Sequence, residues 1–120
     1  MKTIQFYHDR RNNKTYAVDV DFDKDYLISL LYELPRSSVA EVKIGVSQVH
    51  PLDKYNKKTG REVSASKMDW QQLTLHSCYM DDNVIYFFLY DEKKELSYKF
   101  RVCPNTSKVH FLEVDTYYDF

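Results

Sequence analysis

The chain has 120 residues, which predicts one domain, and its apolar share of 43% is typical of a globular protein rather than a disordered one. Its 17 basic and 18 acidic side chains leave a net charge of −1, which excludes a polycation built for nucleic acid and a polyanion that imitates DNA. The N-terminal residues lack an apolar stretch, and no run approaches the roughly 18 apolar residues of a membrane span, so we expect one domain over residues 1–120, in the cytoplasm and without membrane contact.

The N-terminal part predicts a hairpin followed by a helix. Apolar residues at 4 and 6 begin one strand, and the alternation over residues 16–22 predicts a second strand after a polar connection. Asp23 is then placed to cap a helix. Four leucines recur at helical spacing and should form a stripe that packs on a sheet: Leu27, Leu30, Leu31 and Leu34.

A strand and a basic loop follow. Residues 40–47 alternate strictly between apolar and polar, which predicts a strand over residues 39–49 with one buried face. Pro51 ends this strand because it cannot donate to a ladder, and Gly60 permits backbone angles that other residues avoid. The sequence therefore predicts a basic loop over residues 52–59 that leads into a short helix over residues 61–67.

The remaining chain predicts four strands separated by polar turns. The strand over residues 84–90 is apolar at almost every position, which is typical of a central strand covered on both faces, whereas residues 96–102 alternate regularly. The whole chain thus predicts an α+β fold with a mainly antiparallel sheet. Its parts are an N-terminal hairpin, one amphipathic helix, a strand, the basic loop with its short helix, and a C-terminal four-strand meander.

No motif for catalysis or for a cofactor is present. Cys78 and Cys103 lack a CxxC spacing and are expected to be reduced thiols. The four histidines show no metal spacing, and a chain with two glycines contains no phosphate-binding or dinucleotide-binding loop. We therefore expect a protein that is not an enzyme, with no catalytic residue, no metal site and no cofactor.

Alternating aspartates precede the first predicted helix, and carboxylates at this spacing can gather a hard cation. The calcium-loop pattern fails, however, because Lys24 stands at its glycine position and Leu30 at its closing glutamate position. The simpler interpretation is that two of the aspartates face solvent and Asp23 caps the helix. A second alternative is that Asp21 or Asp23 with Glu41 and Lys43 resembles the metal-binding core of PD-(D/E)xK nucleases, although a helix separates the two strands here.

The basic loop is the best candidate for a binding site. Residues 53–67 carry five basic and two acidic side chains. Clustered lysines with a tyrosine can neutralise phosphates and stack a base, and the start of the following helix would add to an anion site. The candidate binding residues are Lys54, Tyr55, Lys57, Lys58, Arg61 and Lys67.

Tyrosine and phenylalanine are concentrated in the C-terminal half, where some of them could form an exposed face for a protein partner. Most of these rings must be core. The tail, residues 117–120, is the expected exception because chain ends are rarely buried.

The segment over residues 53–67, with the pattern Asp-Lys-aromatic-x-Lys-Lys-x-Gly-Arg and then a short helix, is similar to a segment of small bacteriophage proteins. In those proteins the helix commonly continues Ile-Ala-x-Gly-Arg, whereas this chain has Val-Ser-Ala-Ser-Lys over residues 63–67 and loses the glycine. The resemblance implies a small phage or mobile-element protein, a class rich in inhibitors of host defence.

These observations lead to three hypotheses. The first is a binding protein of phage origin that inhibits or redirects a host protein or ribonucleoprotein complex in the host cytoplasm, for example a CRISPR system, through the basic loop. The second is direct binding of nucleic acid by the same loop. The third is the metal-dependent nuclease described above.

Overall fold

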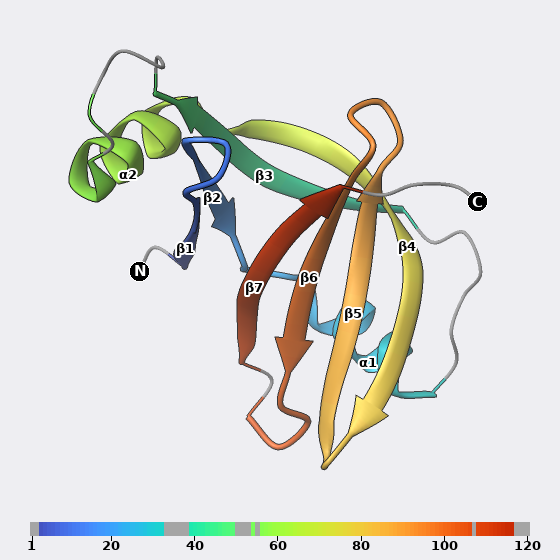
Figure 1. The fold of residues 1–120 in the computed structure, drawn as a ribbon. Coiled ribbons are helices and arrows are strands. Elements are labelled where there is room, and N and C mark those ends of the chain that lie inside the picture. Colours follow the sequence, from blue (N-terminus) through green and yellow to red (C-terminus); the bar gives the residue numbers. More distant parts are fainter. Residues whose placement is uncertain (1–2, 33–38, 50–53, 55, 107, 117–120) are drawn as a thin grey trace.

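The protein is described by a computed structural model that covers residues 3–32, 39–49, 54, 56–106 and 108–116. Seven strands form one antiparallel sheet in which every strand pairs with its neighbours in the sequence, and two helices accompany it (Figure 1). The strands are β1 Ile4–Asp9, β2 Lys14–Asp19, β3 Val39–Gln48, β4 Asp69–Asp81, β5 Val84–Asp91, β6 Leu96–Val102 and β7 Val109–Thr116. The helices are α1 Lys24–Tyr32 and α2 Lys57–Ser66, and neither of these described helices is long and apolar enough to cross a membrane.

The expected α+β fold with a separate four-strand meander is wrong, because the molecule is mainly β and the meander has seven strands. β3 pairs with β2 on one side and with β4 on the other, so the N-terminal hairpin continues directly into the C-terminal strands. Alternation along a strand reports which residues are buried, but it does not report which strand lies beside it. For that reason the sequence located the strands and misjudged how they join.

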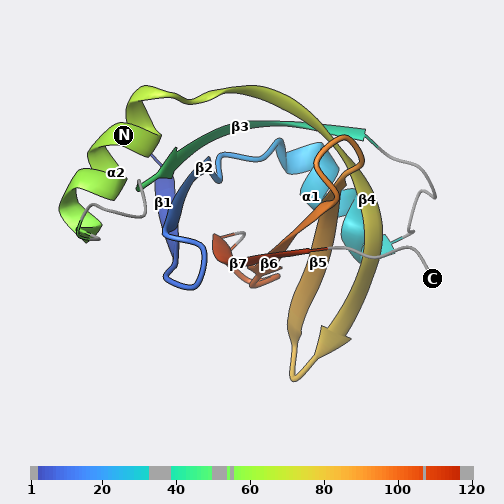
Figure 2. The same ribbon diagram turned by 45° about the horizontal axis from the view of Figure 1, so that its top comes forward.

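The sheet curls until its first and last strands lie side by side, which gives a nearly closed barrel (Figure 2). No backbone ladder joins β1 to β7 among the described residues, and the side chain of Gln5 connects them instead. Its Nε2 donates to the carbonyl oxygen of Val109 at 3.1 Å, and its Oε1 accepts from the backbone N–H of Phe111 at 2.7 Å. A barrel closed in this way has a seam at β1 and β7.

Helix α1 lies on the concave side of the sheet and contributes to the core (Figure 2). Leu27 and Leu30 are buried, as the leucine spacing predicts, whereas Leu34 lies outside the described residues. The predicted cap is confirmed, because a carboxylate oxygen of Asp23 accepts from the backbone N–H of Asp25 at 2.7 Å. Before the helix, the Phe22 ring meets the rings of the core edge to face.

The strand β5 is covered on one face only, so the expectation of cover on both faces is wrong. Ile85, Phe87 and Leu89 are buried in the core, and the residues between them are half-buried on the convex side. The outer residues of β5 are mostly aromatic, and a continuous apolar run therefore reflects rings on the outside rather than a second covering layer.

Candidate functional site

Helix α2 is held against the sheet at both glycines of the chain. A Cβ atom added to Gly60 would overlap the hydroxyl of Thr15 on β2, and one added to Gly45 on β3 would overlap the carbonyl oxygen of Ser64. The buried hydroxyl of Ser47 also donates to the carbonyl oxygen of Gly60 at 3.1 Å. The backbone of α2 thus lies directly on β2 and β3, which fixes the orientation of its outer side chains.

The helix begins at Lys57, four residues before the predicted start, so much of the expected basic loop is its first turn. Asn56 is the cap residue, and its Oδ1 accepts from the backbone N–H groups of Lys58 and Thr59 at 2.9 and 3.2 Å. Asparagine is a preferred cap residue, so Asn56 indicates a helix that starts at residue 57. The predicted start at residue 61 was too late because Gly60 was assigned to the loop. Asn56 therefore satisfies two of the backbone N–H groups at the start of the helix.

The predicted site residues do not all come together. Lys54, Lys57, Lys58 and Arg61 are exposed around the first turns of α2, and Tyr55 lies outside the described residues. Lys67 is at the C-terminal cap of the helix. A helix of this length separates its two ends by about 15 Å, since each residue adds about 1.5 Å, so Lys67 is not part of the same cluster.

The structure adds Arg10, from the turn between β1 and β2, to the predicted cations. The pKa of His8 on β1 is lowered, first by burial and then by the positive charges of Lys57, Arg61 and Arg10. Lys57 and Arg61 belong to α2, far from His8 in the sequence, and lie close enough to act on its imidazole, whereas Arg10 is two residues from His8 along the chain. The sequence signal for Arg10 is its place in a basic turn.

We call Arg10, Lys57, Lys58 and Arg61 the α2 cationic patch. Within the ranges that the structure describes, none of the four side chains forms an ion pair with a carboxylate. A groove of about 410 Å³ lies beside the helix, and its lining includes Val49, Lys54 and Val63. Exposed and unpaired cations that a rigid helix holds together form a surface suited to an anionic partner.

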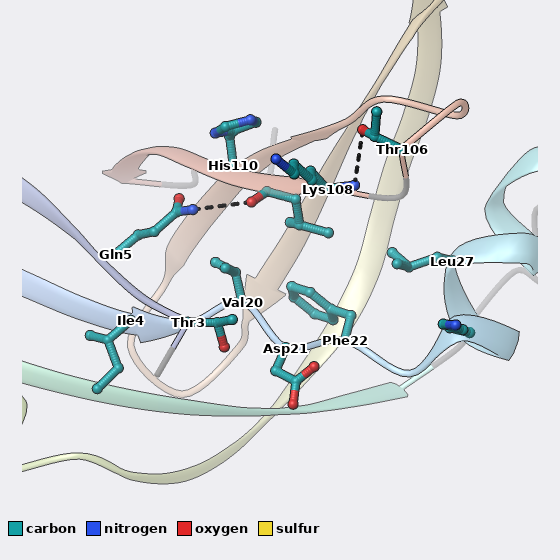
Figure 3. Close-up of a pocket in the computed structure, with 12 residues that line it drawn as sticks. Thr3, Ile4, Gln5, Val20, Asp21, Phe22, Leu27, Thr106, Lys108 and His110 are labelled. Atoms are coloured by element: carbon teal, nitrogen blue, oxygen red, sulfur yellow. Dashed lines mark hydrogen bonds between the residues drawn. The ribbon is translucent and has the colours of Figure 1, made fainter. Parts of the chain in front are cut away.

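A second pocket, of about 520 Å³, lies at the barrel seam (Figure 3). Val20, Phe22 and Leu27 supply its apolar part, His110 comes from β7, and Lys108 immediately precedes that strand. Figure 3 shows the carboxylate of Asp21 turned away from His110, so the pocket does not bring an acid and a base together. Its mixed lining contains no arrangement that points to a reaction.

The residues of the nuclease alternative do not converge. The carboxylate of Asp23 caps α1, Glu41 is exposed on β3, and the Nζ atom of Lys43 lies 5.9 Å from the ring centre of Trp70. No group of three His, Cys, Asp or Glu side chains in the described ranges has the geometry of a metal site. Nothing in these ranges favours a metal-dependent nuclease.

The two cysteines are free, as expected from their spacing. Burial raises the pKa of the Cys78 thiol, and its Sγ lies 3.9 Å from the carbonyl oxygen of Leu30 on α1. A raised thiol pKa reduces the thiolate fraction at neutral pH, which makes Cys78 a packing residue rather than a nucleophile.

The α2 cationic patch is therefore the best-defined candidate site in the described part of the chain. No protein-family model, no curated protein and no solved structure matches this chain.

Proposed function

We propose that this protein is a non-catalytic binding protein that docks on an anionic surface of a macromolecular target through the α2 cationic patch. The observation that carries this proposal is the exposed, unpaired cluster of Lys57, Lys58 and Arg61 on a helix whose backbone contacts the sheet at Gly45 and Gly60. Arg10 adds a cation from the turn that follows β1. Separate segments supply these charges, and a rigid contact orients them, so the patch is pre-organised for binding.

The resemblance of residues 53–67 to a segment of small bacteriophage proteins supports a host target. In this proposal the protein occupies a surface of a host protein or ribonucleoprotein complex and thereby blocks or redirects it, in the manner of inhibitors of host defence. Exposed lysine and arginine side chains steer such an encounter and are screened by salt. Binding should therefore be fast at low ionic strength and should weaken as salt is added.

The test compares two triple variants with the same change in charge. Lys57→Glu, Lys58→Glu and Arg61→Glu reverse the patch, whereas Lys93→Glu, Lys94→Glu and Lys108→Glu reverse exposed lysines elsewhere. We expect the wild type and the second variant to capture the same bacterial protein or ribonucleoprotein from a lysate, and the first variant to lose it. Glutamate in the first turn of a helix is favourable, so the melting temperature of the first variant should change little.

Treating the lysate with nuclease separates this proposal from direct binding of nucleic acid. Capture that survives treatment indicates a protein surface as the contact. Capture that is lost, together with a shift of free DNA or RNA at low salt that the wild type gives and the α2 patch variant does not, would favour the nucleic-acid hypothesis. Equal capture by the patch variant and the wild type would refute a role for α2 altogether.

A further inference from the structure

A second uncovered surface lies on the convex side of β4, β5 and β6, opposite the core. Directly paired residues share a face, and the pairs Tyr79 with Tyr86 and Phe88 with Lys99 alternate with buried residues, so all four side chains point outward. Figure 1 shows this side of the sheet toward the viewer, with neither helix crossing it. We call Tyr79, Tyr86 and Phe88 the convex aromatic cluster.

The rings of this cluster are stacked on one another. The ring centres of Tyr79 and Tyr86 are 5.2 Å apart with an angle of 18° between the planes, and those of Tyr79 and Phe88 are 6.2 Å apart with an angle of 28°. The Nζ atom of Lys99 lies 5.4 Å from the Tyr86 centre and 5.6 Å from the Phe88 centre. Lys99 thus covers the side of the cluster toward β6, whereas Tyr79 is 46% exposed.

Another contact between an aromatic ring and a lysine lies near the start of β4. Trp70 is 61% exposed, and it is paired across β3 and β4 with Lys43, whose Nζ atom lies 5.9 Å from the indole ring centre. Lys43 alternates with buried β3 residues, so Trp70 is on the same convex side as Tyr79. Two large exposed rings, Trp70 and Tyr79, therefore lie on the convex side of one strand, which has a bulge between them. Lys43 lies beside Trp70, whereas Lys99 lies beside Tyr86 and Phe88, the rings stacked on Tyr79.

The chemistry of these pairs selects the ligand. Exposed rings stack on unpaired bases, and lysine or arginine beside them neutralises the phosphates between those bases. The cations on this face are Lys43, Lys99 and exposed Arg101, which is paired with Tyr86. Carboxylates are present on the same face, because exposed Glu113 of β7 is paired with Lys99 and exposed Asp81 lies two residues beyond Tyr79.

From this arrangement we infer that the convex face of β4, β5 and β6 binds single-stranded nucleic acid. One base stacks on Tyr79 and another on Trp70, and Lys99, Arg101 and Lys43 contact the backbone. The inference goes beyond the proposed function and shares no residue with the α2 cationic patch. Either surface can therefore fail its test without affecting the other.

The experiment measures fluorescence anisotropy of labelled oligothymidylate and oligouridylate of about 15 nucleotides, the length that one small β-barrel domain covers. At low salt we expect the wild type to bind both single strands more tightly than a duplex of equal length. Tyr79→Ala and Trp70→Ala should each weaken binding by about tenfold, the effect of losing one stacked base. Tyr79→Phe, which keeps the ring, should bind as the wild type does.

Two controls connect the result to stacking at this face. Met80→Ala removes a neighbouring side chain that is 60% exposed but is paired with the buried Ile85, and it should leave the affinity unchanged. When it is added to the α2 patch variant, Tyr79→Ala should weaken binding of the oligonucleotides by the same factor as it does in the wild type. No binding of either single strand by the wild type would overturn the inference, as would unchanged affinity of both alanine variants. Self-association that Tyr79→Ala abolishes would overturn it in favour of a second copy.

Discussion

Gln5 on β1 and Phe111 on β7 are joined by a hydrogen bond of 2.7 Å from the backbone N–H of Phe111 to the Oε1 atom of the Gln5 side chain. The other end of the same amide donates to the carbonyl oxygen of Val109 at 3.1 Å. One side chain therefore satisfies a donor and an acceptor on the edge of β7, as a neighbouring strand would. The closure of the barrel is thus held by the amide of Gln5, together with the edge-to-face contact of Tyr7 with Phe111.

Gln5→Ala should open the seam. Removing two hydrogen bonds of roughly 1 kcal/mol each should lower the free energy of unfolding by about 2 kcal/mol in urea titration. Amide hydrogen exchange at Phe111 should accelerate, and exchange in β3 should not change. Gln5→Met keeps the length of the side chain without its hydrogen bonds, so Phe111 should exchange as fast in this variant. Slow exchange at Phe111 in both variants would show that the amide does not hold the seam.

Gly60→Ala should destabilise the protein although alanine is the better helix former by about 1 kcal/mol. The added methyl group meets the hydroxyl of Thr15, and overpacking of this kind costs about 1–3 kcal/mol. Thermal unfolding of the double variant Thr15→Ala with Gly60→Ala should show a smaller loss than the sum of the two single losses. Thr59→Ala, at an exposed position of the same helix, is the control and should have little effect.

The combination Lys57→Gln with Arg61→Gln should raise the pKa of His8, since both cations disfavour the protonated imidazole. Burial is the largest cause of the shift, so the pKa should stay below the ordinary value of 6.5. An NMR titration of the His8 ring measures this directly. Lys93→Gln with Lys94→Gln is the control. An unchanged His8 pKa in the Lys57→Gln, Arg61→Gln variant would show that the charges of α2 do not act on His8.

The same shift predicts how stability depends on pH. The pKa of His8 is lower in the folded state than in the unfolded state, so between the two values the unfolded chain binds more protons. The contribution of His8 to stability is therefore complete above pH 6.5 and is lost as the pH falls through the folded pKa. The Lys57→Gln, Arg61→Gln variant should lose less stability over this window than the wild type does.

Asn83→Gly should stabilise the hairpin between β4 and β5. Asp82 and Asn83 both have positive φ, at 51° and 61°, which is the backbone of a two-residue turn that favours glycine at its second position. We expect a gain of about 0.5 kcal/mol for glycine and a loss of about 1 kcal/mol for Asn83→Ala, which lacks the local hydrogen bonding of asparagine. Chemical denaturation of both variants decides the sign, and a stabilising alanine would contradict the turn assignment.

The sequence predicted the strands well and the sheet poorly, for a physical reason. Alternation in β3 and β6 identified their buried faces, and polar residues indicated the turns between the C-terminal strands. The closure through Gln5 could not be predicted, because a glutamine on an edge strand carries no signal of its distant partners. The prediction that β5 is covered on both faces was wrong for a similar reason. The exposure of its outer rings depends on whether another layer of the molecule covers that face of the sheet.

The candidate site was predicted in part. Lys57, Lys58 and Arg61 lie together as their spacing indicates, and Asn56 explains why their helix starts early. Arg10 was missed because Lys57 and Arg61 come near His8, two residues before Arg10, only when α2 packs across β2 and β3. Lys67 was included only because it is close to the other cations in the sequence. The helix places it at the opposite end from Lys57, about 15 Å away.

The order of the sheet also bears on how the molecule assembles during synthesis. Every contact described above for α2 lies within the first 68 residues, whereas β7 belongs to the last part of the chain. Because synthesis proceeds from the N-terminus, α2 can pack on β2 and β3 before β5, β6 and β7 have been synthesised. Joining β7 to Gln5 is then the final event, and a nascent chain stalled before β7 would leave the Gln5 amide without its two backbone partners.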